Sequence, residues 1–392
     1  MKTIIILFIP AIILLFFYNI FTFHQQEQFV HLAYSFLQGK LYFLYPPPHW
    51  GDTTYFRGQH YWPLGPFPAI LLMPFVYIFG IHMQQGYLAF FLNILNAYLL
   101  FRIANKIHND FYFSLTISFA ILFATAYLGI ALTSQSWYYA QVVNFSLILL
   151  ALEAFFYLRS WLLIGLYLGF AIATRTTSVG AIVFFTICLF SSSASNHERF
   201  KKVFLLLLPI VLSLMTLGFY NYARFANIFE TGYPQALIFG EALANKSYGI
   251  WSFIHFPANF YYLFLKMPDP IFIPGTKVMQ FPFLNAGGWG MSILFTSPIF
   301  IWIFFSSWKK LEVKAAFVTS LTILFLILGY FGIGAWQYGY RYAVDIYPFL
   351  FIILVYALKR KITFMFLLVT ILAFVINSYL LITAFRDPFK FF

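Results

Sequence analysis

The chain has 392 residues, of which 62% are hydrophobic and only 9% are charged, and its mean hydropathy is +0.84. Soluble domains carry roughly 25% charged residues, so this composition excludes a set of soluble domains and indicates a polytopic membrane protein. The net charge of +12 comes from short basic clusters between apolar runs, which is typical of the positive-inside pattern and not of nucleic-acid binding. The single cysteine, Cys188, excludes an intramolecular disulfide and a cysteine-based zinc site.

The first apolar run, residues 3–23, is long enough to cross the ~30 Å hydrocarbon core of a bilayer. Lys2 precedes it and no A-x-A cleavage site follows, so we expect an uncleaved signal anchor with a cytoplasmic N-terminus. Together with later apolar runs it predicts an all-α polytopic membrane protein of about eleven transmembrane helices. The later runs lie near 86–104, 111–133, 137–158, 161–173, 176–190, 203–223, 289–307, 315–336, 343–358 and 362–384.

Two polar stretches, 24–62 and 224–288, stand out by their length. Irregular backbone cannot face lipid, so we expect both to be outer loops that carry short interfacial helices. No repeat period and no similarity between the halves is visible, which argues against a repeat-built array. We therefore expect a single membrane-embedded domain, 1–392, with a first outer loop at 24–85 that includes a Pro-rich re-entrant or membrane segment.

The Pro-rich segment 63–81 is long enough to cross the membrane but contains four prolines, which break helices. If it does not cross and 161–190 makes two short crossings, every basic cluster between spans falls on the inner side. If it crosses and 161–190 is one span, Arg102, Lys106 and Arg159 move to the outside. The positive-inside rule favours the first topology.

The first outer loop concentrates groups that can do chemistry. It holds the carboxylates of Glu27 and Asp52, in a chain with eleven acidic residues in all, together with four histidines, Lys40 and Arg57. A carboxylate at the membrane surface suits a general base that activates an acceptor hydroxyl, and nearby cations suit a phosphate leaving group. The alternative is that these residues are the solvated part of a loop.

The loop and three later segments carry a family resemblance. The run HLAYSFLQGKLYF, the following Asp52 and the stretch YFRGQHYWPLGPFPAILLMPFVYIFG resemble the opening of GT-C glycosyltransferases. More narrowly, they resemble bacterial relatives of the dolichyl-phosphate-mannose–protein mannosyltransferase family. The resemblance continues in NYARFANIFETGYP (221–234), GWGMSILFTSPIF (288–300) and GYRYAVDIYPFL (339–350). It implies the GT-C fold, a catalytic Asp or Glu in the first outer loop, and a polyprenyl-phosphate sugar donor.

The same resemblance assigns roles to residues of the loop. The first-loop acid of the family falls closest to Glu27, although the usual acidic pair reads Gln25-Gln26-Glu27 here. Asp52 is the alternative base, or a residue that orients the acceptor. The remaining polar residues of the loop are candidates for binding the acceptor or the sugar, namely His31, Arg57, His60 and Tyr61.

A lipid phosphate also requires a basic residue near the outer membrane surface. Arg175 is the first candidate, because it lies between two short apolar runs with no acid near it in the sequence. Arg224, which opens the second outer loop, and Arg341 are further candidates. The structural alternatives are that Arg341 pairs with Asp345 four residues later and that Arg224 snorkels from the end of a span.

Metal chemistry has a weaker basis. No H-E-x-x-H spacing occurs, so the sequence assigns no metal ligands and no certain cofactor. His24, Glu27 and His31 share a helix face, where a divalent cation is an alternative to ordinary polar contacts. Glu153 is expected to pair with Arg159 or another polar neighbour.

The sequence therefore predicts a GT-C-type transferase of a hexosyl or pentosyl group in the cell (plasma) membrane. It would move a sugar from a polyprenyl-phosphate donor to an acceptor hydroxyl on the outer face, with the donor tail in a groove between spans. Its partners would be the donor, membrane lipids and an acceptor glycan, lipid or protein, with no nucleic acid. The alternatives are a membrane transporter or a lipid-linked glycan flippase or ligase. Transport is disfavoured because the charges lie at the outer surface and no internal symmetry is visible.

Overall fold

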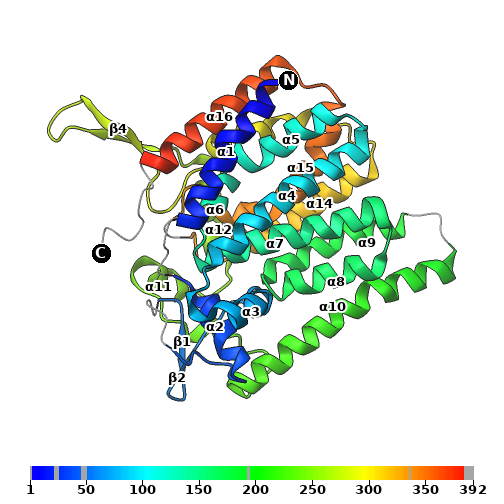
Figure 1. Ribbon diagram of the computed structural model, residues 1–392, viewed down its shortest axis with the longest axis vertical. Coiled ribbons are helices and arrows are strands. Elements are labelled where there is room, and N and C mark those ends of the chain that lie inside the picture. Colours follow the sequence, from blue (N-terminus) through cyan, green and yellow to red (C-terminus); the bar gives the residue numbers. More distant parts are fainter. Residues whose placement is uncertain (1, 22–25, 46–50, 192–194, 335–336, 384–392) are drawn as a thin grey trace. The chain divides into compact units, whose positions relative to one another are not determined.

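The computed structural model describes residues 2–21, 26–45, 51–191, 195–334 and 337–383 (Figure 1). The chain divides into two compact units. Unit 1 comprises Met1–Ala11, Ile107–Ile130 and Glu241–Phe392, and unit 2 comprises Ile12–Lys106 and Ala131–Gly240. Helix α1 (Lys2–Phe21) is divided between them.

Each remaining element is assigned to the unit that holds most of its residues. Unit 2 contains α2 (Gln28–Leu37), β1 (Thr54–Phe56), β2 (Gln59–Tyr61), α3 (Phe67–Phe79), η1 (Gly80–His82), α4 (Gln85–His108), α7 (Ser136–Glu153), η2 (Ala154–Leu158), α8 (Trp161–Ile172), η3 (Thr176–Ala181), α9 (Ile182–Phe190), α10 (Asn196–Phe225) and η4 (Tyr233–Gln235). Unit 1 contains α5 (Phe111–Phe123), α6 (Tyr127–Leu132), α11 (Gly240–Lys246), η5 (Phe253–His255), α12 (Phe256–Phe260), η6 (Tyr261–Leu265), β3 (Asp269–Phe272), β4 (Met279–Asn285), α13 (Ile293–Thr296), η7 (Pro298–Phe305), α14 (Leu311–Leu328), η8 (Arg341–Ile346), α15 (Tyr347–Leu358) and α16 (Phe364–Thr383).

The elements confirm an all-α polytopic membrane protein. Within the described ranges, six helices are long and apolar enough to cross a membrane: α4, α7 with η2, α10, α14, η8 with α15, and α16. Shorter apolar helices cover most of the other expected spans. The run 289–307 is an exception, because Pro298 follows the short α13 and the chain continues as the 3-10 helix η7.

In unit 2, α4 and α7 run in the same direction and are joined near both ends. At their first residues, the Ser136 hydroxyl donates to the Gln85 amide oxygen at 3.0 Å. About 26 Å along each helix, at 1.5 Å per residue, Arg102 forms a 3.0 Å ion pair with Glu153. Of the two expected partners of Glu153, Arg159 or another polar neighbour, the structure shows the second, Arg102. Arg159 ends the π-helical turn η2 in a left-handed conformation.

The Pro-rich segment forms α3, whose 13 residues extend over about 20 Å and which continues into the 3-10 turn η1. It packs along α2 and begins against the end of α8, where Phe67 N–H donates to the carbonyl of Ala173 at 3.3 Å. Gly65 is required at this approach, because a Cβ there would lie 2.1 Å from the same carbonyl oxygen.

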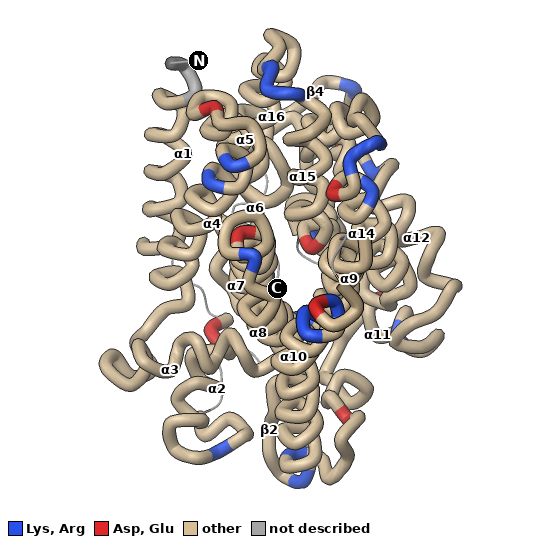
Figure 2. The backbone as a smooth tube through the Cα atoms, turned by 90° about the vertical axis from the view of Figure 1, so that its right-hand side faces the viewer, with Lys and Arg blue, Asp and Glu red and all other residues tan. Residues whose placement is uncertain are grey.

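Helices α8 and α10 form the most extensive helix pair of unit 2. Their backbones approach closely at Gly165, where a Cβ would lie 2.2 Å from the carbonyl oxygen of Leu206. Further along, Ser213 donates to the carbonyl of Gly169 at 2.7 Å. The basic residues of α10 gather at its two ends, as Figure 2 shows. Because α10 has 30 residues, about 45 Å, its last turn extends well beyond the end of α8.

The two long polar stretches meet in unit 2. Strands β1 and β2 form a hairpin whose two loop residues, Arg57 and Gly58, both have positive φ, as a two-residue type I′ turn requires. The start of this hairpin also pairs with the second stretch, since Asp52 N–H donates to Leu237 and Leu237 N–H donates to Thr53. The second stretch therefore holds the first in place.

In unit 1, the second polar stretch contacts the C-terminal ends of two spans. The Trp251 indole donates to the carbonyl of Leu326 near the end of α14 at 3.1 Å. Tyr379, near the end of α16, donates to the carbonyl of Pro282 at 2.9 Å. Figure 1 shows β4 at this end of α16. The lysine-rich segments that precede α14 and α16 lie at the opposite ends of these helices.

Candidate functional site

Glu27 occupies the N-cap position of α2 and is buried, with 7% of its surface exposed. Its Oε2 accepts a 2.8 Å hydrogen bond from the backbone N–H of Gln85, the first residue of α4. A helix N-terminus favours negative charge, so α4 stabilises the carboxylate form. The sequence candidate for the base is thus held between the beginnings of two helices.

A neutral polar network fixes the backbone beside Glu27. The Gln85 amide nitrogen donates to the carbonyls of Gln26 and Ser134, both at 3.1 Å. Ser136 donates to the same Gln26 carbonyl through its hydroxyl at 2.9 Å and its backbone N–H at 3.0 Å. Gln85 is fully buried, and its role has no local signature because it lies 58 residues from Glu27.

The environment of Glu27 changes its acidity. Burial raises the pKa of the carboxyl group from 4.5 to about 8, although the hydrogen bonds from Gln85 act in the opposite direction. A carboxyl group with a pKa near neutrality suits a general base, because it is partly ionised and still basic enough to take a proton.

Arg224 lies in the last turn of α10 and is buried, with 6% of its surface exposed. Its guanidinium stacks 3.8 Å from the centre of the Tyr220 ring and donates to the Trp62 carbonyl at 2.8 Å and to Asn221 at 2.7 Å. Its Nε has no hydrogen-bond partner, and it forms no ion pair within 4 Å, among the described residues. Burial excludes the snorkelling alternative and leaves a cation that can accept an anionic partner.

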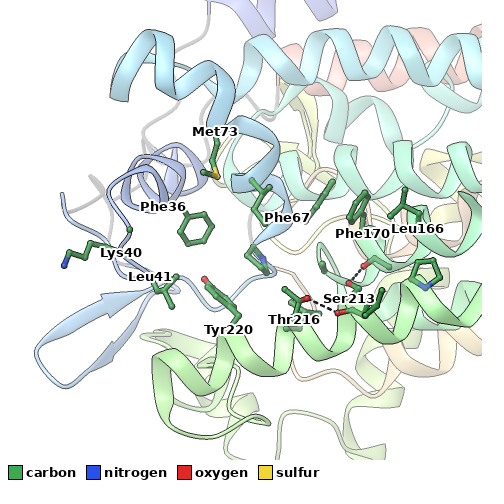
Figure 3. A pocket seen from close by; sticks show the side chains of 18 residues that line it. Phe36, Lys40, Leu41, Phe67, Met73, Leu166, Phe170, Ser213, Thr216 and Tyr220 are labelled. Atoms are coloured by element: carbon green, nitrogen blue, oxygen red, sulfur yellow. Dashed lines mark hydrogen bonds between the residues drawn. The ribbon is translucent and has the colours of Figure 1, made fainter. Parts of the chain in front are cut away.

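An apolar groove of about 560 Å³ lies in unit 2 (Figure 3). This volume is within the 300–1,000 Å³ range typical of ligand pockets. It is lined by residues of α3, α8 and α10 and by the end of α2, and Lys40 is the only charged lining residue. The Ser213 hydroxyl donates to the carbonyl of Gly169 in α8, and the Thr216 hydroxyl donates to the carbonyl of Leu212 in its own helix. These two hydroxyls therefore offer little to a polar ligand. Tyr220, whose ring carries the Arg224 guanidinium, lines one end.

Trp62 connects Glu27's helix to Arg224. Its ring packs edge-on against Phe29 of α2 at 5.8 Å, while its carbonyl accepts from Arg224. The indole N–H of Trp62, the hydroxyl of Tyr139 and both amide atoms of Gln28 are buried and have no hydrogen-bond partner among the described residues. Sequence reasoning missed these three residues, since nothing in their local spacing distinguishes them from core side chains.

The other first-loop candidates lie on or near the β1–β2 hairpin. Asp52 has a left-handed backbone with φ 62, and its backbone is tied to the second polar stretch. His60 contacts Thr53 at 3.3 Å, and burial lowers the pKa of its ring. Tyr61 packs against Phe225 at 5.1 Å, and burial raises its pKa while Arg224 acts in the opposite direction. These contacts bring Tyr61 and Arg224 into one region.

Two further candidates lie elsewhere in unit 2. Arg57 is exposed at the hairpin turn, with its guanidinium 5.1 Å from the Phe56 ring. His31 lies one turn after Glu27 on α2, where burial lowers the pKa of its ring. Its Nδ1 has no hydrogen-bond partner among the described residues.

The remaining phosphate candidates lie at separate positions. Arg175 is half-buried between α8 and η3, two residues after the groove-lining Ala173. Arg341 belongs to unit 1, where it is buried in η8; its backbone N–H donates to Gln337 at 3.0 Å and its guanidinium lies 4.8 Å from the Tyr342 ring. Sequence reasoning placed Arg175 first, whereas the structure gives Arg224 the clearest relation to a groove.

The described part of the chain contains no group of three or more His, Cys, Asp or Glu side chains that could hold a metal ion. The alternative cation site on the first loop included His24, which lies outside the described residues.

The fold has known counterparts. It is similar to crystal structures of ArnT from Cupriavidus metallidurans, one bound to undecaprenyl phosphate and one in the apo state, with TM-scores of 0.53 and 0.51. Each comparison has 12% identity and covers 92% of this chain and 60% of the ArnT chain. The chain has a GT-C fold. This similarity confirms the fold that the sequence resemblance implied, without singling out the mannosyltransferase relatives. The chain spans about 60% of the length of ArnT.

A third GT-C structure, the oligosaccharyltransferase of Archaeoglobus fulgidus in the apo form, matches with a TM-score of 0.49 and 12% identity, over 95% of this chain and 55% of that one. No protein-family model matches the sequence, and no curated protein matches it.

Proposed function

We propose that this protein is a glycosyltransferase that takes its sugar from a polyprenyl-phosphate donor. The observation that carries the proposal is the apolar groove of unit 2, with the buried Arg224 stacked on Tyr220 at one end. An isoprenoid tail needs an apolar channel, and its phosphate needs a cation at the end of that channel. The likeness to ArnT in complex with undecaprenyl phosphate supports the same class of donor.

In this proposal the donor tail lies between α3, α8 and α10. The groove walls bring almost exclusively apolar surface to the tail, and the Ser213 and Thr216 hydroxyls are already hydrogen bonded to backbone carbonyls. The donor phosphate lies near Arg224, whose Nε is available for a charge-assisted hydrogen bond. Lys40 and Arg175 supply further positive charge near the groove, and Arg341 is a further candidate for the phosphate.

Glu27 is the proposed base. The acceptor hydroxyl oxygen attacks the anomeric carbon, its proton passes to the Glu27 carboxylate, and the bond between that carbon and the phosphate oxygen breaks. The electron pair leaves with the polyprenyl phosphate, whose charge Arg224 stabilises. Asp52 is the alternative base or orients the acceptor, while His31, Arg57, His60 and Tyr61 are proposed to bind the acceptor or the sugar.

We further propose that the chain acts as one membrane-embedded domain in the cell (plasma) membrane, with its N-terminus in the cytoplasm. The lysine-rich ends of α14 and α16 would then face the cytoplasm, and both long polar stretches would face outward. Transfer would occur at the outer face, to a glycan, lipid or protein. The sugar would be a hexosyl or pentosyl group.

The decisive experiment uses the full chain, purified and reconstituted in lipid, with a radiolabelled polyprenyl-phosphate sugar and a panel of candidate acceptors. We expect transfer that Glu27→Gln abolishes and that the matched variant Glu241→Gln, in the exposed α11, retains. Wild-type protein that moves the donor across vesicles without consuming it would support the transporter or flippase alternative and contradict our proposal.

The placement of the donor tail in the groove can be tested separately, by comparing donors with long and short tails. Ala173→Leu adds bulk to the groove wall, so the KM for a long-chain donor should rise while the KM for a short-chain donor stays unchanged. An equal change for both donors would contradict the placement of the tail, because it would indicate a general loss of structure.

A further inference from the structure

The β3–β4 hairpin of unit 1 exposes an apolar face. Met279, Phe281 and Phe283 are alternate residues of β4, whose pairing with β3 is irregular between Pro270 and Phe272, and the register pairs Met279 with Phe272 of β3. The Phe281 and Phe283 rings lie 5.9 Å apart, which confirms that they share this face. All four side chains are exposed, by 38% to 63%. Exposed large apolar side chains gathered in this way mark a surface that contacts something other than water.

The position of the hairpin identifies what that contact is. The 20 residues of α16 extend about 30 Å, which matches the hydrocarbon core, so the last turn of α16 lies at the membrane interface. Tyr379 in that region donates to the carbonyl of Pro282 at 2.9 Å, and its ring lies 6.4 Å from the Phe281 ring. The hairpin is therefore held at interfacial depth.

The exposed surface of α16 continues into the hairpin. Its exposed apolar side chains recur at helical spacing along one face: Met365, Leu368, Leu372, Val375 and Ile376. This lipid-facing stripe leads to Tyr379, and Phe281 of the hairpin packs on Tyr379. The apolar face of the hairpin is thus continuous with a surface that already contacts acyl chains.

Charge near the hairpin turn fits a lipid surface as well. Lys277 is exposed, and its ammonium lies 5.6 Å from the centre of the Phe272 ring. A lysine beside apolar side chains can reach the phosphate groups of lipids while its stem stays in the apolar layer. The only acidic residue of the two strands, Asp269, is at the base of the hairpin and is paired with Lys266.

We propose that the β3–β4 hairpin is an interfacial anchor that inserts its apolar face into the lipid bilayer beside the end of α16. Aromatic residues and a lysine at the boundary between headgroups and acyl chains are typical of such anchors. The anchor fixes the second polar stretch at the membrane surface. This inference rests on the hairpin and α16 alone and does not depend on the proposed glycosyltransferase activity.

The test places an environment-sensitive fluorophore on single cysteines of the full chain in lipid nanodiscs. Cys188→Ala provides the background, since Cys188 is the only native cysteine and is buried. Met279→Cys reports the apolar face, and Gln280→Cys is the matched control, because it is the next residue and points to the other face. Both variants should keep the thermal unfolding midpoint of the background.

We expect blue-shifted emission from the label at position 279, with about twofold or stronger quenching by lipids that carry a nitroxide near the headgroup, compared with position 280. Water-like emission and equal, weak quenching at both positions would overturn the proposal. A label that is shielded from water at position 279 but not quenched by lipid, together with cross-linking between copies through Met279→Cys, would also overturn it. That result would identify the face as an interface with a second chain.

Discussion

The two ends of the α4–α7 pair differ in how their charged side chains are neutralised. At one end, Arg102 is neutralised within the protein by Glu153 at 3.0 Å. At the end where the helices begin, the carboxyl group of Glu27 meets only a backbone N–H and neutral side chains, and the Arg224 cation meets a carbonyl, an amide and an aromatic ring. An ion pair completed within the chain needs no ligand, whereas separated buried charges leave room for one. On the function proposed above, the end with the Arg102–Glu153 pair is the structural end of unit 2, and the end with Glu27 and Arg224 is its chemical end.

The sharpest test of this comparison substitutes one arginine from each end. Arg224→Gln should lower kcat/KM for the polyprenyl-phosphate donor by about 100-fold, or about 2.7 kcal/mol, because a neutral amide cannot replace a charge-assisted contact with phosphate. Arg102→Gln should change kcat/KM less than about threefold, since Arg102 is already satisfied by Glu153. Equal losses in the two variants, measured on radiolabelled donor, would remove the functional distinction between the two ends.

The acidity of Glu27 provides a second test. If its ionised form is the base, kcat/KM should rise by about tenfold per pH unit below the pKa of about 8 and level off above it. The Gln85 side chain lowers this pKa, so Gln85→Ala should move the rising limb to higher pH. A pH profile that is flat between pH 6 and 8 would show that Glu27 is not the base.

Stability gives an independent measure of the same carboxyl group. Its pKa is higher in the folded chain than the ordinary value of 4.5, so the folded state binds more protons between pH 4.5 and about 8. The free energy of unfolding should therefore fall as pH rises through this window, by up to about 1 kcal/mol per pH unit. Thermal unfolding of Glu27→Gln should lack this fall, and an identical slope in both proteins would contradict the burial of an ionisable Glu27.

At the opposite end, Glu153→Gln should affect stability and not catalysis. Removing a carboxylate leaves Arg102 without its counter-ion, but the Arg102 side chain is 32% exposed, so we expect a loss of only about 1–2 kcal/mol. The thermal unfolding midpoint of the reconstituted protein measures this. Arg102→Gln and the double variant complete a cycle, and strictly additive losses would mean that the ion pair contributes nothing.

These contrasts also show what the sequence could predict. Apolar runs predicted the all-α membrane fold, because the length of an apolar run can be read from consecutive residues of the sequence. Four prolines likewise indicated that 63–81 is no ordinary span, and the segment forms the short helix α3, which contains Pro74. The run 289–307 looked like a span because its hydropathy is high, and only the structure shows that it divides into α13 and η7.

Partners that are distant in the sequence were beyond such reasoning. Glu27 was a candidate from its position, but Gln85, which binds its carboxylate, lies 58 residues away. Glu153 was expected to pair with Arg159 or another polar neighbour, and the sequence did not identify Arg102, which helix packing brings to it. Arg224 stood out as a span-end cation, yet its burial against Trp62 depends on contacts between the two polar stretches. The fold was therefore more predictable than the site.

The smallest effect is expected at the turn of the β1–β2 hairpin, which is exposed at the chemical end of unit 2. Arg57 has φ 47, a conformation that asparagine adopts more readily than arginine, so Arg57→Asn should raise stability by about 0.5 kcal/mol. Gly58→Ala is the matched opposite: φ is 79 and a Cβ there meets nothing within 4 Å, so its cost of about 1 kcal/mol is that of the backbone alone.

The same variant tests the proposed role of Arg57. If its guanidinium binds the acceptor, Arg57→Asn should raise the KM for the acceptor while the KM for the donor stays constant. Unchanged values for both substrates would limit Arg57 to the turn. The proposed phosphate contact would then depend on Arg224, because burial strengthens the interaction of a charge with its partner.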